Sequence, residues 1–261
     1  MIRRTLRDLT PPMIWRLLGG NSRPDSMAPD RPLQIPESGP RALNYLIGEP
    51  VFVVPMERVR YPDGRRYTIG EHHFMQYYAE GLVALQRYYA SHVPSSIFEK
   101  YFLEAPDGDA PSADGTPWFE YARARVYRGE GGLGPEHGLQ TFGPVSDEKV
   151  QLEARRLDAV RASIARNGYV PALGGYVQGY FMVAGSGDWV FTVRGGFHRT
   201  SAMAYLGFET LPAQFFPRFP RFIEEADIAL WPMVADGRLS EGSARSIFRQ
   251  FFQSSIYSLS H

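Results

Sequence analysis

The chain has 261 residues, of which 44% are hydrophobic and 21% charged, the ordinary composition of a globular protein with a buried core. Lys plus Arg and Asp plus Glu each total 28, so the formal net charge is zero. Nucleic acid is therefore a poor candidate partner, because non-specific binding to it relies on a basic surface. The sequence contains no cysteine, which excludes disulfides, thiolate catalysis and Cys-ligated metal centres. This composition fits a reducing compartment, and we expect the protein in the cytoplasm.

Residues 1–41 are expected to form an N-terminal extension and a linker. Arginines alternate with Leu, Met and Ile over residues 1–20, without the continuous apolar core of a signal peptide. Pro11 and Pro12 interrupt any helix there. Two roles stay open for residues 1–20: packing on the domain, or peripheral contact with a membrane or a protein.

Residues 42–139 are interpreted as a mostly helical, aromatic-rich accessory region. The pattern predicts a strand over 51–54 and a turn at Pro62–Gly64. A helix is predicted from about Gly70 to His92, because aromatic residues and leucines recur at spacings of three and four. A short helix over 95–103 would begin at Ser95 or Ser96 as N-cap. Residues 117–127 fit a strand or an irregular arm equally well.

The segments 140–217 and 218–261 are more regular. Ser146 and Gly168 delimit a predicted helix with one apolar stripe. Strands are predicted over 175–183 and 189–193, followed by a helix from about 198 to 206 and a strand in "ETLPAQFF". Two helices are expected near 220–235 and 240–254. The fold class is therefore α+β, with a small mixed sheet, N-terminal helical additions and a C-terminal helical pair.

The stretch "RGGFHRTS" joins a predicted strand to a predicted helix. Gly195 and Gly196 would let the backbone approach a ligand, and the N–H groups of the first helical turn would then face a phosphate. Arg199 supplies a forked donor for phosphate oxygens, and His198 supplies a general acid or base. Thr200 and Ser201 add hydroxyl donors. The alternative is a glycine turn that only packs the helix on its strand.

The segment "RGGFHRTSAMAYLGFETLPAQF" resembles the signature of the ParB/sulfiredoxin-like superfamily. The likeness extends upstream through "RLDAVRASIARNGYVPAL" and covers about residues 143–217. Against the sulfiredoxin pattern G-G-C-H-R, matches occur at Gly195, Gly196, His198 and Arg199. Phe197 stands where that pattern has its catalytic cysteine, so sulfiredoxin chemistry is excluded.

Against the ParB pattern G-E-R-R-x-R-A, the matches are Gly196, Arg199 and Ala202. Phe197, His198 and Ser201 replace the glutamate and two of the arginines, which argues against the CTP-dependent clamp of ParB. The resemblance therefore implies a nucleotide-phosphate site, with ATP or CTP as the ligand.

The expected function is a nucleotide-binding protein, acting as an ATP- or CTP-dependent phosphotransferase or hydrolase, with Mg²⁺ as accompanying ion. Such chemistry needs a carboxylate near the phosphates, and Glu153 is the candidate, three residues before Arg156 on the same helix. Gln178 is a further candidate ligand contact. No set of metal-ligating residues is predicted. The alternative is a catalytically inactive ParB-like scaffold, linked to surface-polysaccharide biogenesis, for which the apolar Phe197 is the main argument.

Overall fold

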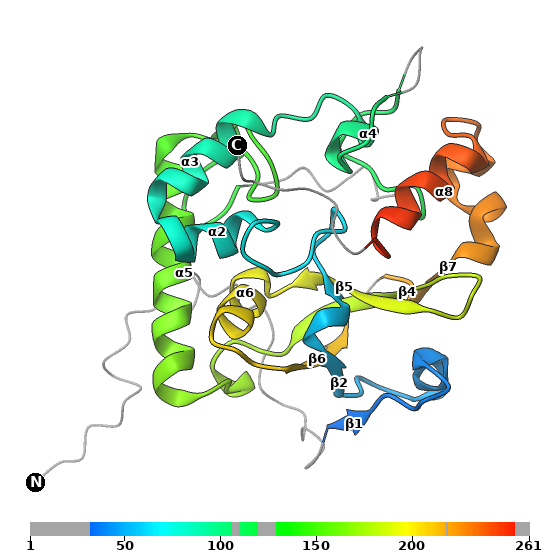
Figure 1. Ribbon diagram of the computed structural model, residues 1–261, viewed down its shortest axis with the longest axis horizontal. Coiled ribbons are helices and arrows are strands. Elements are labelled where there is room, and N and C mark those ends of the chain that lie inside the picture. The colour runs from blue at the N-terminus through cyan, green and yellow to red at the C-terminus, as the bar shows by residue number, and fades with distance from the viewer. Residues whose placement is uncertain (1–31, 106–109, 120–128, 218, 254–261) are drawn as a thin grey trace, which may run out of the picture.

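The computed structural model describes residues 32–105, 110–119, 129–217 and 219–253, so residues 1–20 and their predicted contacts lie outside the described residues. A mixed sheet forms the centre of the molecule, and helices cover both of its faces (Figure 1). The strands are β1 (Leu33–Gln34), β2 (Phe52–Pro55), β3 (Val59–Arg60), β4 (Val177–Val183), β5 (Trp189–Gly195), β6 (Thr210–Phe215) and β7 (Phe222–Glu224). The α-helices are α2 (His73–Glu80), α3 (Leu82–Ser91), α4 (Ile97–Lys100), α5 (Asp147–Asn167), α6 (Phe197–Tyr205), α7 (Pro232–Ala235) and α8 (Glu241–Gln250). The predicted α+β class is confirmed.

The strands follow the order β1-β2-β6-β4-β5-β3, and β7 pairs with β4. β4 and β5 form the predicted antiparallel hairpin, whereas β4 and β6 run parallel. β2 lies antiparallel to β6, and β3 lies parallel to β5. Because β2 and β3 belong to the segment 42–139, that segment supplies strands to the same sheet in addition to its helices.

Each face of the sheet is buried under its own hydrophobic cluster. Val177, Phe181 and Val183 of β4 lie on the face covered by α2, α3, α5 and α6. Tyr180 and Met182 alternate with them and face the cluster formed with α8 and the 231–233 segment. This alternation is the period of two that a strand imposes, and both faces are apolar because both are covered.

Helix termini follow the sequence signals where a cap is present. The Ser146 hydroxyl accepts the Lys149 N–H at 3.2 Å and begins α5, which ends at Gly168 with φ of 70°. Ser96 caps α4 through the Glu99 N–H, and Ser240 caps α8. The turn at 62–64 is also confirmed, since the Tyr61 N–H donates to the Arg65 carbonyl at 2.8 Å.

Two helix predictions are wrong, one in its extent and one in the type of structure. The helix predicted over 70–92 is interrupted at Gly81, which has φ of 79° and separates α2 from α3. The helix predicted near 220–235 is replaced by β7, a 3₁₀ segment (Glu225–Leu230) and the short α7. Parallel pairing of Phe222–Glu224 with β4 buries Ile223 there, and this tertiary contact overrides the local helical preference.

Candidate functional site

The predicted strand–glycine–helix junction lies between β5 and α6. β5 ends at Gly195, Gly196 adopts φ of 96° as the N-cap, and α6 begins at Phe197. The first backbone bond of the helix runs from the Thr200 N–H to the Gly196 carbonyl at 2.9 Å. No described side chain caps this helix, and the N–H groups of residues 197–199 precede the first backbone bond within it.

The Arg199 side chain folds back over this helix end. Its Nη1 donates to the carbonyl oxygens of Gly174 and Gly175, in the loop that precedes β4. Burial lowers the pKa of Arg199 below its usual value, although an arginine remains charged at neutral pH. Among the residues that the structure describes, no carboxylate forms an ion pair with it.

The Arg199 guanidinium occupies the space that a side chain at position 196 would need. A Cβ atom at position 196 would lie 2.9 Å from Arg199 Nη2 and 3.1 Å from Val177 Cγ2. At Gly195 the nearest atoms are 3.7 Å away, an ordinary contact distance. We predicted that both glycines allow a ligand to approach the main chain. Gly196 instead makes room for the guanidinium, and the space around Gly195 would accept a methyl group.

His198 and Glu153 are brought together by α6 and α5. His198 Nε2 lies 2.6 Å from Glu153 Oε2, and its ring stacks on Phe74 with centroids 5.0 Å apart and planes 22° apart. Because a carboxylate only accepts, Nε2 carries the hydrogen of this bond, and in the neutral ring Nδ1 has the lone pair. Nδ1 has no partner in the described ranges and is not one of the atoms sealed in the interior. The His198 side chain is 15% exposed, whereas that of Glu153 is fully buried.

Two buried cations and a second carboxylate hold Glu153. Lys149 Nζ lies 3.0 Å from Glu153 Oε1, and Arg156 Nη1 lies 3.3 Å from the same oxygen. Glu130 contacts both cations at 2.8 Å from a glycine-rich loop. Burial raises the pKa of Glu153, but His198, Lys149 and Arg156 outweigh it and lower the pKa to about 2. Glu153 is therefore ionised at neutral pH, and the two cations balance the two carboxylates.

The hydroxyls of two predicted site residues are not directed toward this helix end, and a third predicted residue lies beside Gly195. The Thr200 hydroxyl donates to the Gly196 carbonyl at 3.1 Å, within its own helix. Ser201 is fully buried in the core, and its Oγ has no partner within the described parts of the chain. Gln178 has the strand parity of Tyr180 and Met182, and its Oε1 would lie 3.7 Å from a Cβ atom at Gly195. The prediction that the Thr200 and Ser201 hydroxyls donate to a ligand beside α6 is therefore not supported by their placement, whereas the role of Gln178 stays a prediction.

Some residues of this site can be identified from their spacing in the sequence, and others cannot. Glu153 and Arg156 share a helix face at spacing three, and Lys149 extends that face at spacing four, a pattern that sequence reasoning can detect. Glu130 lies in the segment "GEGGLG", whose irregular path no periodicity predicts. Phe74 is one of many aromatic residues in its region, and nothing local singles it out.

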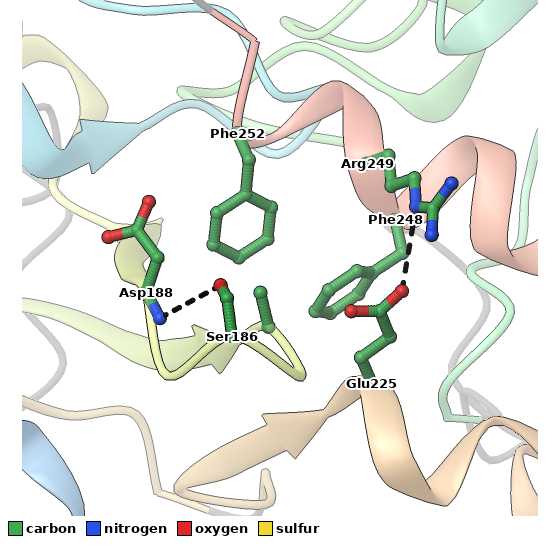
Figure 2. Close-up of a pocket in the computed structure, with 7 residues that line it drawn as sticks. Ser186, Asp188, Glu225, Phe248, Arg249 and Phe252 are labelled. Carbon is green, nitrogen blue, oxygen red and sulfur yellow. Dashed lines mark hydrogen bonds and ion pairs between the residues drawn. The ribbon is translucent and has the colours of Figure 1, made fainter.

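A separate surface pocket lies on the other side of the sheet, with a volume of about 310 Å³ (Figure 2). The pocket is formed by the β4–β5 turn, the start of the 225–230 segment and the end of α8. Its lining residues are Ala184, Ser186, Asp188, Glu225, Phe248, Arg249 and Phe252. Both carboxylates of this pocket already have partners. Glu225 accepts the Gly185 N–H at 2.9 Å and pairs with Arg249, and Asp188 pairs with Arg58 at 2.7 Å.

The described residues contain no group of three or more His, Asp or Glu side chains that could hold a metal ion. Nor does any described helix combine the length and the apolar character needed to cross a membrane. No protein-family model matches the sequence, and no curated protein matches it significantly. The ParB/sulfiredoxin-like resemblance therefore remains a prediction based on the motif itself.

Proposed function

We propose that this protein binds a nucleotide through its phosphate groups at the N-terminal end of α6. We call this region the α6 site and define it by the N–H groups of residues 197–199, the Arg199 guanidinium, and the His198–Glu153 pair. All of its donors come from one helical turn that follows β5 directly. A phosphate bound there would contact the guanidinium and the free N–H groups together.

The observation that carries the proposal is the electrostatic state of Arg199. A cation at a helix N-terminus faces the positive end of the helix dipole, which is unfavourable by a few tenths to about 1 kcal/mol. This guanidinium is also largely withdrawn from water, and two neutral carbonyl groups are its only hydrogen-bond partners in the described part of the chain. An anionic ligand would compensate both effects, because charge-assisted hydrogen bonds contribute about 1.5–3 kcal/mol each.

The His198–Glu153 pair favours a reaction over simple binding. A buried, ionised carboxylate fixes the ring orientation and tautomer of the histidine, and the opposite ring nitrogen is not fully buried. This arrangement suits proton transfer during hydrolysis or phosphotransfer. The proposed activity is therefore that of an ATP- or CTP-dependent hydrolase or phosphotransferase, with any Mg²⁺ carried in by the nucleotide phosphates.

Thermal unfolding with a nucleotide panel, with and without Mg²⁺, tests the binding. A ligand at 100 times its Kd stabilises the folded state by about 2.7 kcal/mol, which corresponds to a rise in Tm of roughly 5–10 °C. Arg199→Ala should abolish this rise. Arg41→Ala, which removes an exposed arginine paired with Glu224 outside the α6 site, should leave it intact. A panel without any stabilising nucleotide refutes the proposal, and a rise that survives Arg199→Ala places the ligand elsewhere.

A second candidate function, non-catalytic binding as a scaffold, is favoured by Phe197. Its side chain is 7% exposed and packs on Tyr61, with ring centroids 5.1 Å apart. The position that carries the reactive group in both related patterns thus belongs to the core here. Nucleotide stabilisation without turnover and without covalent labelling would favour this scaffold function.

A further inference from the structure

We propose that His198 takes the terminal phosphoryl group of the bound nucleotide onto Nδ1, so that the reaction proceeds through a phosphohistidine. This inference rests on the proposed nucleotide binding at the α6 site. It assigns to His198 the role of nucleophile, in place of a proton carrier only.

The two ring nitrogens of His198 differ in their availability. Nε2 is held at 2.6 Å by the fully buried Glu153, so it is closed to a ligand. Nδ1 has a lone pair in the neutral ring, is not fully buried, and is the ring nitrogen nearer its own main chain. Residue 198 lies in the first turn of α6, the turn whose N–H groups would hold the phosphate.

Other side chains of the α6 site are unsuited to accept a phosphoryl group. The hydroxyls of Thr200 and Ser201 belong to fully buried residues, and the Thr200 hydroxyl is bonded within the helix. Glu153 is also fully buried and is held by Lys149, Arg156 and His198. Arginine is not a nucleophile at neutral pH. His198 is thus the accessible nucleophile of the site.

The transfer step balances without a further reactant. The Nδ1 lone pair forms the N–P bond while the bond from the terminal phosphorus to its bridging oxygen breaks, and that electron pair leaves on the nucleoside diphosphate. The ring becomes a phosphorylated imidazolium that keeps its Nε2 hydrogen. Attack by water on phosphorus then releases inorganic phosphate and restores the neutral ring.

Glu153 is placed to stabilise the positive ring that this step creates. It is ionised, buried and in direct contact with Nε2. Lys149, Arg156 and Glu130 together carry one net positive charge, so they keep Glu153 ionised, and its attraction for the ring depends on the direct contact with Nε2 at 2.6 Å. Stacking on Phe74 fixes the ring plane, which keeps Nδ1 directed to one side. Glu153 is therefore a positioning residue, and Phe74 supports the same orientation.

The test is covalent labelling of the full chain with ATP or CTP carrying ³²P in the terminal phosphate. We expect a protein-bound label that is lost in acid and retained in alkali, as phosphoramidates behave, and that mass spectrometry assigns to His198. His198→Gln should remove the label. His137→Gln replaces another partly exposed histidine, 25% exposed against 15%, and should retain it.

Glu153 variants separate its charge from its shape. Glu153→Gln keeps the shape and should slow labelling at least about 100-fold, whereas Glu153→Asp keeps the charge and should restore part of the rate. A purely structural role would give the opposite ranking. An acid-stable label, or one assigned to another residue, overturns the inference. Nucleotide stabilisation without any label also overturns it but leaves the proposed binding intact, whereas no stabilisation refutes the binding proposal itself.

Discussion

The two adjacent glycines should respond very differently to the same substitution. Gly196→Ala places a methyl group 2.9 Å from Arg199 Nη2 and 3.2 Å from its Nε, at a residue with φ of 96°. Positive φ costs an alanine about 1–2 kcal/mol. Displacing the guanidinium from the Gly174 and Gly175 carbonyls costs a further 1.5–3 kcal/mol or so for each bond that is lost. We therefore expect a loss of about 2.5–5 kcal/mol if one bond is lost and about 4–8 kcal/mol if both are, a fall in Tm of at least about 5 °C.

Gly195→Ala is the matched control. The added methyl group would meet Gln178 and Phe216 atoms no closer than 3.7 Å, so stability should change by less than about 0.5 kcal/mol. Urea unfolding of both variants followed by circular dichroism gives the comparison. Combining Gly196→Ala with Arg199→Ala should cost less than the sum of the two changes, because the second removes the clash. Equal losses at positions 195 and 196, or strict additivity in the double variant, would refute the account of this junction.

Two further predictions concern stability. The pKa of Glu153 is lowered from 4.5 to about 2, so its ionisation stabilises the folded state above pH 4.5 and this contribution, on the order of 3 kcal/mol, is lost as the pH falls toward 2. Urea midpoints measured from pH 6 to pH 2.5 should fall more steeply for the wild type than for Glu153→Gln, and parallel curves would contradict the assignment. Ser146→Ala removes the hydroxyl that accepts the Lys149 N–H and should cost about 1 kcal/mol in urea unfolding. A midpoint unchanged within error would show that the cap does not contribute.

The sequence identifies those elements whose signals are local. Ser146 and Gly168 delimit α5 because a capping hydroxyl and a left-handed glycine act within one turn of the helix end. The β4–β5 hairpin is likewise predicted by two apolar runs around a short polar turn. At Gly81 the aromatic period continues across the break, so the pattern alone predicts one helix where the structure has two.

Features that depend on distant partners could not be predicted in this way. β7 forms because residues 222–224 pair with β4. The sequence of 222–224 alone does not reveal this partner. The contact between Glu153 and His198 joins two helices 45 positions apart. The chemistry of both side chains makes them candidates in the sequence, but the sequence does not place one against the other. The role of Gly196 was misjudged for the same reason, since the space that it leaves is filled by a side chain three residues later.

The pairing of β2 with β6 has a consequence for biosynthesis. β2 is a wholly apolar strand that emerges from the ribosome about 160 residues before its antiparallel partner. At translation rates of about 5–20 residues per second, it waits about 8–30 s before that edge is covered. Chaperones that recognise extended apolar segments should therefore engage the nascent chain at this strand, and completion of the sheet should be a late, slow event governed by long-range chain closure.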